Sequence, residues 1–343
     1  MERHYKYKEI ITMTFSQIHN SIKARLPLTV QFLIEMMSYW KRLCVYNASI
    51  ATNNHKVKME YTLLRENHII EKGMSMRDTR HGFGKEKVTA LIQRLRTYNK
   101  LYGTDDSSFI DYPLSTIKAY IEYQHHDNID ITKIETLFKQ LCKEVNISIE
   151  NLSSPAGIEL VQSKDLQQWA KGNFSSLLHS RHSLRYFKEE LPSREQLDTA
   201  LYLAARTPSA CNRQAWHTHI FFNDDVHEIL RMQEGCNGFS DDIHCCIVVT
   251  ADMKGFLGHE PFQCYIDGGL YAQNLINSLH YIGLGTIPLS CGFLNDKLHK
   301  IQKKFNIPHN EVLIVIIGVG VMTEQVKIAI STRRPIEATN VYH

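Results

Sequence analysis

Long hydrophobic runs and regularly spaced cysteines are both missing from this sequence of 343 residues. It has no stretch of about 18 apolar residues, so we expect no transmembrane helix and no membrane partner. Its eight cysteines form no CxxC motif, which argues against a zinc site and a secreted disulfide framework. The opening residues, MERHYKYKEIITMTF, are charged and lack the apolar core of a signal peptide. We therefore expect a cytoplasmic protein with reduced thiols and no metal.

A strong excess of charge of either sign is also absent, because the formal net charge is +3. Residues 1–150 carry 22 basic and 17 acidic side chains, and the remainder carries 17 and 19. Neither part is basic enough to predict a nucleic-acid partner. Proline and glycine are few, at 9 and 17, and 43% of the residues are hydrophobic, which is typical of a globular chain. The length allows two domains or one elaborated domain.

The amino-terminal region, residues 1–150, is expected to be mainly helical. Apolar residues recur near helical spacing in three segments, at 28–46, 85–100 and 130–145. Asp130 is a plausible N-cap for the third of these helices.

Residues 175–343 are expected to form a second domain, in which helices and strands alternate. The polar stretch before it contains serine and proline, so we predict a linker over residues 151–174. Strands are predicted at 217–222, 244–252 and 312–322, and helices at 192–207, 224–233, 265–285 and 294–305. Ser193 and Gln196 fit a capping box at the start of the first of these helices. This mixture predicts an α+β or α/β unit with three layers.

The segment SRHSLRYF (180–187) places Arg181, Ser183 and Arg185 at every second position. In an extended chain this period points the three side chains the same way, which makes an anion-binding edge. Taken alone, the pattern fits a solvated strand edge equally well.

Three later segments carry related chemistry. RTPSACNRQAWH (206–217) stops a helix and then offers side-chain amides. GLGTIPLSCG (283–292) combines flexible glycines with an extended proline-containing stretch, and STRRPIEATNVYH (331–343) adds paired arginines. Guanidinium groups suit a phosphate, and amides suit the polar edge of a heterocycle. Together the four segments match the needs of a phosphorylated flavin.

These four segments, in this order, resemble the FMN-dependent nitroreductase family over about residues 175–343. The resemblance implies an α+β fold, namely a three-layer α/β/α domain with a central, mostly antiparallel sheet. It implies a homodimer with FMN at the subunit interface. It also implies that NADH or NADPH reduces a small-molecule acceptor through the flavin, by ping-pong hydride transfer.

The resemblance assigns cofactor-binding residues by motif position. Two of them, Arg181 and Ser183, correspond to the phosphate and ribityl end, and Arg185 corresponds to the N1–O2 edge of the ring. The loop that begins at Pro208 is expected to reach the ring from the partner chain. The full expected set is Arg181, His182, Ser183, Arg185, Pro208, Ser209, Asn212, Gln214, Pro288, Leu289, Ser290 and Arg333. No protein acid or base is obligatory, so no catalytic residue is named.

Two other functions remain open at this point. The same flavin site could oxidise or remodel a biosynthetic intermediate, or the chain could be a non-catalytic flavin-binding or redox-sensing module. Residues 63–87 resemble a segment that precedes the domain in some bacterial family members linked to polysaccharide biosynthesis. Within it, His68, Glu71 and Lys72 share one helical face, for which a hydrogen-bonded structural cluster is favoured over a metal site.

Overall fold

The computed structural model describes residues 56–343, apart from 78, 81, 104–106 and 258–259, together with some residues between 27 and 41. His55–Gly255 and Cys264–His343 make one compact unit. Met1–Asn54 and Phe256–Gln263 make another. In that second unit, the residues described between 29 and 41 are helical, which agrees with the helix predicted at 28–46. The rest of the predicted helix lies outside the described residues.

The amino-terminal part of the large unit is helical, as predicted. Its helices are α3 (Lys56–Met74), α4 (Lys85–Tyr102), α5 (Ser107–His126) and α6 (Thr132–Glu144). They enclose a core of their own, because each helix turns an apolar stripe inward. Helix α4 shows the pattern clearly, with Val88, Leu91, Ile92 and Leu95 buried at helical spacing. None of the helices in the described part of the chain is long and apolar enough to cross a membrane.

Asp130 is not the N-cap of α6, as predicted, but the residue just before the N-cap. The N-cap residue is Ile131, whose side chain cannot accept a hydrogen bond. The Asp130 carboxylate instead accepts from Thr132 N at 3.1 Å and from Thr132 Oγ1 at 2.8 Å. The carboxylate still satisfies a free amide of the first turn, which is the role of a capping side chain.

The predicted linker, residues 151–174, contains regular structure that its composition did not indicate. Strand β1 (Ile158–Gln162) and helix α7 (Ser163–Ala170) both lie within it. β1 pairs antiparallel with β6 (Gln325–Ala329), with Leu160 opposite Lys327. Because this partner strand is remote in the sequence, local composition carries no signal for the pairing. The domain boundaries themselves stay a prediction.

The carboxy-terminal part is built around one antiparallel sheet. The three predicted strands and four predicted helices are present, whereas α8 and β4 were not predicted. Its helices are α8 (Phe174–Ser180), α9 (Arg194–Ala204), α10 (Asp224–Gln233), α11 (Gln263–Tyr281) and α12 (Asn295–Lys304). The sheet has the order β2 (Trp216–Phe222), β3 (Cys245–Asp252), β5 (Glu311–Val321), β4 (Leu284–Ser290). All neighbours are antiparallel. The predicted capping box of Ser193 and Gln196 is present at the start of α9.

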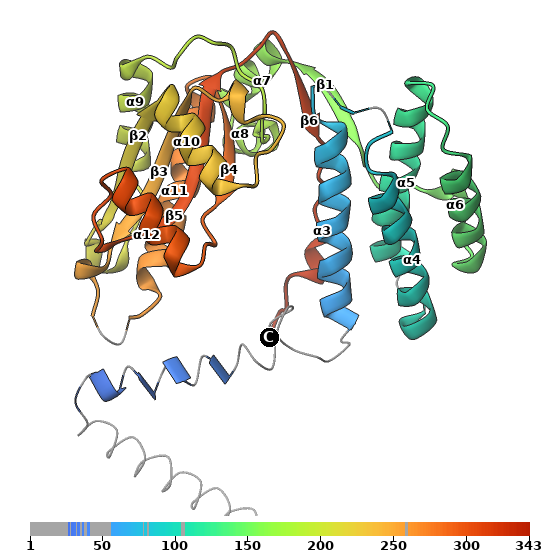
Figure 1. Cartoon of the computed structure of the whole chain (residues 1–343), viewed down its shortest axis with the longest axis horizontal. Coiled ribbons are helices and arrows are strands. Elements are labelled where there is room, and N and C mark those ends of the chain that lie inside the picture. Colours follow the sequence, from blue (N-terminus) through green and yellow to red (C-terminus); the bar gives the residue numbers. More distant parts are fainter. Residues whose placement is uncertain are drawn as a thin grey trace, which may run out of the picture. The chain divides into compact units, whose positions relative to one another are not determined.

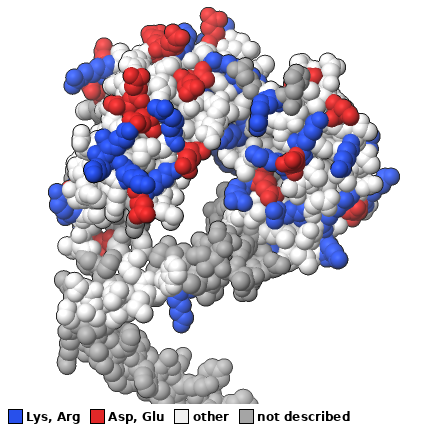
Figure 2. Space-filling model, viewed as in Figure 1, with Lys and Arg blue, Asp and Glu red and all other residues white. Residues whose placement is uncertain are grey.

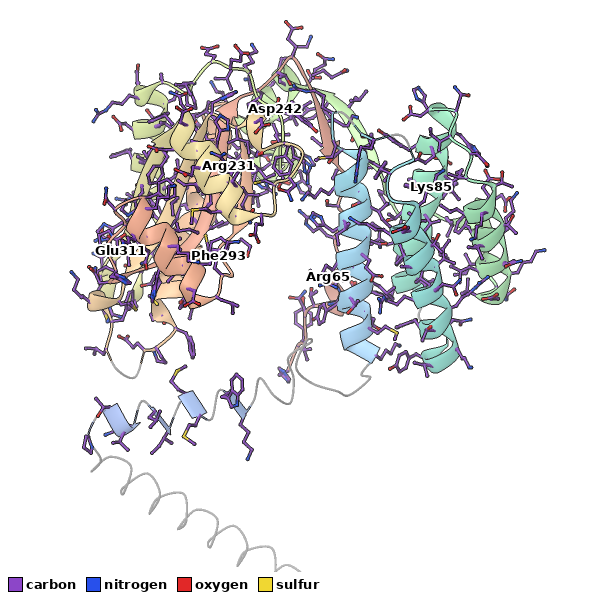
Figure 3. All side chains as sticks on the ribbon, in the orientation of Figure 1. Arg65, Lys85, Arg231, Asp242, Phe293 and Glu311 are labelled. Atoms are coloured by element: carbon purple, nitrogen blue, oxygen red, sulfur yellow. The ribbon has the colours of Figure 1, made fainter. Side chains whose placement is uncertain are left out.

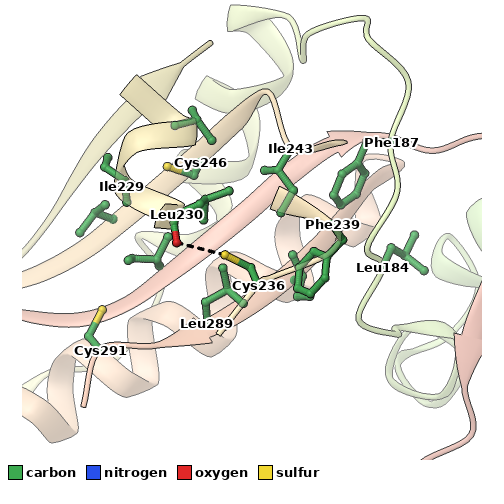
Figure 4. Packing of buried hydrophobic residues seen from close by; sticks show 14 of the residues in the cluster. Leu184, Phe187, Ile229, Leu230, Cys236, Phe239, Ile243, Cys246, Leu289 and Cys291 are labelled. Carbon is green, nitrogen blue, oxygen red and sulfur yellow. Dashed lines mark hydrogen bonds between the residues drawn. The ribbon is translucent and has the colours of Figure 1, made fainter. Parts of the chain in front are cut away.

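Helices cover both faces of this sheet (Figure 1). Along β3, Cys246 and Val248 face a core shared with α10 and α12, shown in Figure 4. The intervening Ile247 and Val249 face a second core shared with α9 and α11. This alternation follows from the period of two along a strand. The predicted three-layer α+β architecture is confirmed.

Two glycines, one in a turn and one inside a strand, help to position the strands near the candidate site. The helix predicted at 265–285 ends at Tyr281, and Gly283, with φ 94°, turns the chain into β4. Further on, Gly320 of β5 lies directly against the Phe187 side chain, so the GVG sequence at 318–320 reflects close packing.

Candidate functional site

The segment that follows α8 runs along the outer edge of the sheet. Leu184 N donates to Thr286 O at 2.9 Å, and Ser183 forms a parallel bridge with Thr286 of β4. Because β4 is an edge strand, this bridge is possible without displacing another strand. The first and third of the predicted FMN-binding segments therefore lie side by side.

The three side chains of the Arg-Ser-Arg pattern do not share one environment, which corrects the expectation of a common edge. Arg181 and Ser183 are half-buried, whereas Arg185 is buried, with 5% of its surface exposed. Leu184 and Phe187 enter the core between α10 and the sheet. The segment is therefore anchored by its apolar residues, and it is not a solvated strand edge.

Arg181, His182 and Arg333 form a group of mutually repelling basic residues, here called the 181/333 cluster. Burial lowers the pKa of Arg181, and the charge of Arg333 lowers it further. Burial also lowers the pKa of His182, with added contributions from Arg181 and Arg333. Arg333 is thus close to the 181–182 segment, although 151 residues lie between Arg181 and Arg333 in the chain. Such a cluster is suited to a phosphate, which would neutralise the repulsion.

A neutral histidine lies next to this cluster. Nε2 of His280 is 2.8 Å from Ser180 Oγ, and the ring is 4% exposed. Burial lowers the pKa of His280 to about 4, and the charges of Arg181 and His182 act in the same direction. His280 therefore adds no positive charge near neutral pH. The sequence analysis did not single out this residue, because it lies inside an apolar helical stretch.

Arg185 has partners that the sequence analysis did not foresee. Its Nη1 donates to Ser75 Oγ at 2.9 Å, in the turn that follows α3. Its guanidinium carbon lies 6.0 Å from the centre of the Phe239 ring. Its Nε is buried and has no hydrogen-bond partner among the described residues. Burial lowers the pKa of Arg185. The Nε donor is thus left without a hydrogen bond in a place that water reaches poorly.

The third segment, Pro288, Leu289 and Ser290, forms the end of β4. Pro288 and Ser290 are exposed, and Leu289 is buried in the core. The carbonyl of Ser290 accepts a hydrogen bond from Gln233 Nε2 at 3.1 Å. Among the described strands, none pairs with the outer side of β4 beyond Thr286. Backbone groups at this edge are consequently available to a ligand.

The loop from Pro208 to Gln214 lies apart from the other predicted residues. Pro208, Asn212 and Gln214 are exposed, and Ser209 Oγ accepts from Gln214 N at 3.0 Å. Asn212 and Gln214 have φ of 54° and 49°, a conformation that is uncommon outside glycine. In the described structure none of these four residues bonds to the 181–185 segment. The expectation that the loop serves the partner chain stays a prediction.

Asp267 of α11 holds this loop in place. Its carboxylate accepts from Ala210 N at 3.1 Å, and the residue is only 1% exposed. A buried carboxylate that binds a loop amide fixes the loop conformation strongly. Asp267 therefore has a structural role in the fold of this loop.

A cavity of about 1080 Å³ lies between α10 and α12, and Ser290 is the only predicted FMN-binding residue in its described lining. Figure 2 shows basic and acidic side chains mixed over these helices, and Arg231 and Phe293 are labelled there in Figure 3. Lys297 pairs with Glu234 at 2.8 Å, and Lys304 pairs with Glu228. Because charges in this cavity neutralise each other, it is a weaker anion site than the 181/333 cluster.

Comparison with known proteins supports this assignment. The sequence model of the nitroreductase family matches residues 178–239, which include the 181–185 segment and the 208–214 loop. Over this region, the chain is similar to the nitroreductase family. A protein of Archaeoglobus fulgidus named "Putative NADH dehydrogenase/NAD(P)H nitroreductase" is 25% identical over 148 residues, covering 42% of this chain and 82% of its own. A protein of the same name from Methanothermobacter thermautotrophicus is 24% identical over 147 residues, 43% of this chain and 76% of its own.

Solved structures also match about half of this chain. A nitroreductase family protein from Streptococcus pneumoniae is 20% identical and covers 50% of this chain and 100% of its own, with a TM-score of 0.43. A Desulfovibrio desulfuricans protein solved in complex with FMN is 19% identical. The match covers 50% of this chain and 98% of that protein, with a TM-score of 0.44.

The amino-terminal helices contribute residues next to the site. Glu71 accepts from Tyr112 OH at 2.8 Å and from Gly157 N at 2.9 Å, so its carboxylate has structural partners other than His68 and Lys72. Burial raises the pKa of Glu71 despite these hydrogen bonds. Lys72 and Ser75 follow Glu71 in the chain and also lie near the site. The polar helical face within residues 63–87 was the sequence feature that pointed to this region.

Proposed function

We propose that this protein is an FMN-dependent oxidoreductase that uses NADH or NADPH to reduce a small-molecule acceptor. The observation that carries the proposal is the 181/333 cluster, in which Arg181, His182 and Arg333 gather beside the edge of β4. The printed names of the two related proteins, "Putative NADH dehydrogenase/NAD(P)H nitroreductase", support it.

The residues present fit a phosphorylated flavin. Arg181 and Arg333 would hold the phosphate, because guanidinium groups bind phosphate oxygens in pairs. Arg185 would lie at the N1–O2 edge of the ring, where its unused buried Nε supplies a donor. The exposed backbone of residues 288–290 would run beside the ring. When bound, FMN supplies hydride transfer between the nicotinamide and the acceptor.

We further propose a homodimer in which the Pro208–Gln214 loop of one subunit completes the site of the other. The outer face of α11 exposes Tyr265, Ile266 and Leu270, each between 47% and 53%. Contiguous apolar surface of this kind is typical of an interface between subunits.

A cytoplasmic location also remains our prediction, and it is supported by the absence of disulfides among the seven described cysteines.

The acceptor is proposed to be a specific metabolite rather than any nitro or quinone compound. Ser75 and Lys72 of the helical region lie next to Arg185, and a broadly reactive site has no need of such neighbours. Oxidation or remodelling of a biosynthetic intermediate at the same site remains the alternative, because it needs the same flavin contacts.

The first test is the visible absorption spectrum of the purified full chain, before and after anaerobic NADH. Flavin bands that bleach on addition of NADH would support the proposal, and Arg181→Gln and Arg333→Gln should each weaken FMN binding. Lys188→Gln is the control, because this exposed residue follows the same segment without joining the cluster. A colourless protein that does not bind added FMN would overturn the proposal.

A further inference from the structure

A cavity of about 630 Å³ lies where the end of α3 and the start of α4 meet residues 234–238. Its apolar lining comes from Ile69, Met76 and Phe83. Its basic lining comes from Lys72, Arg80 and Lys87. The cavity therefore combines a hydrophobic wall with three cations, and nothing in the proposed FMN contacts uses it.

The positive charge of this cavity is not neutralised by the described residues. Glu234 is the one carboxylate in the described lining, and it pairs with Lys297 at 2.8 Å. Arg80 and Lys87 are exposed and form no ion pair with any described carboxylate. A hollow that concentrates cations without matching anions attracts negatively charged molecules.

Lys72 joins the cavity to the proposed flavin site. Its Nζ donates to Gly235 O at 2.7 Å and lies 5.3 Å from the centre of the Phe239 ring. Phe239 is also the ring beside Arg185. Burial lowers the pKa of Lys72, and the charges of Arg185 and Lys87 lower it further, which shows that the three cations lie close together.

We propose that this cavity binds an organic anion whose carboxylate or phosphate contacts Lys72, Arg80 and Lys87. The apolar body of the ligand would lie against Ile69, Met76 and Phe83. This inference rests on the proposed function, because the cavity adjoins Arg185 and would hold the electron acceptor. It makes the acceptor an acidic metabolite and gives the amino-terminal helices a role in selecting it.

The test compares two probes that differ in charge, 4-nitrobenzoate and 4-nitrobenzyl alcohol, by isothermal titration calorimetry on the full chain. The wild type should bind the benzoate more tightly than the alcohol, and increasing salt should reduce the difference. In the double variant Arg80→Gln/Lys87→Gln, the dissociation constant for the benzoate should rise about tenfold, which is about 1.4 kcal/mol. Binding of the alcohol should change little.

Lys100→Gln is the matched control, because Lys100 is exposed on the same helix as Lys87 but does not line the cavity. Equal affinity for the two probes, or a benzoate affinity that the double variant leaves unchanged, would overturn the inference. The FMN content of each preparation separates the two proposals. A colourless protein that prefers the benzoate keeps the anion site and refutes the flavin, whereas a yellow protein without that preference refutes only the anion site.

Discussion

Ser75 Oγ accepts a hydrogen bond from Arg185 Nη1 at 2.9 Å, and both residues are buried. This contact joins the turn after α3 to the 181–185 segment, which is expected to bind the flavin. A buried guanidinium that loses a partner is left with another unsatisfied donor. The contact therefore links the stability of the helical region to the geometry of the site.

Replacing Ser75 by alanine should lower the free energy of unfolding by about 1–3 kcal/mol, because Arg185 would lose its one hydrogen bond to a side chain. Urea unfolding followed by circular dichroism measures this. Ser115→Ala is the control, since the Ser115 hydroxyl is buried without a partner and its removal should cost little. Equal losses in the two variants would show that the Ser75 bond contributes nothing specific.

Arg185→Gln should lower the reduction potential of bound FMN by about 30 mV, because a cation beside the ring stabilises the reduced flavin. A spectroelectrochemical titration provides the value. Arg194→Gln, which alters an exposed arginine in an i,i+4 pair on α9, should leave the potential unchanged. An unchanged potential in the Arg185 variant, with FMN still bound, would contradict the assigned role.

His280 should make stability depend on pH between about 6.5 and 4. Its folded pKa is lowered to about 4, so below pH 6.5 the unfolded chain takes up a proton that the folded chain excludes. The contribution of His280 to the free energy of unfolding should thus be fully present above pH 6.5, and the free energy of unfolding should fall by about 2 kcal/mol by pH 5. Urea unfolding of His280→Gln should show a smaller loss between pH 7.5 and 5, while the exposed control His126→Gln should match the wild type.

Gly320→Ala should destabilise the sheet by about 1–3 kcal/mol, because the new Cβ would lie 2.7 Å from Phe187 Cδ1. Thermal unfolding followed by circular dichroism tests this. Gly269→Ala should have the opposite effect, since nothing lies within 4 Å of its Cβ and alanine favours the helix. A Gly320 variant as stable as the wild type would mean that Phe187 packs elsewhere.

Leu270→Asp should convert the proposed homodimer to a monomer and reduce its FMN content, since a charge would be placed on the apolar face of α11. Analytical ultracentrifugation gives the mass, and absorption gives the flavin content. Leu101→Asp changes a similarly exposed leucine on α4 and should preserve the dimer. A wild-type chain that sediments as a monomer while retaining FMN would refute the shared site.

The sequence by itself indicated most helices and three strands of the carboxy-terminal part, and the resemblance to the nitroreductase family, but it did not indicate β4 as a strand. Strand β3 and helix α9 were predictable because their apolar periods and the Ser193–Gln196 capping box are local signals. The 181–185 segment and the 208–214 loop identified the family because their motifs are also local, and the family comparison confirmed it.

Only the tertiary structure decided what lies next to those motifs. The pairing of β1 with β6, the Ser75–Arg185 hydrogen bond and the nearness of Arg333 to Arg181 all join residues far apart in the chain. Such contacts depend on how the cores close, and no short stretch of sequence encodes them. The period of two predicted a common direction for Arg181 and Arg185, but burial of Leu184 and Phe187 gave the two arginines different surroundings.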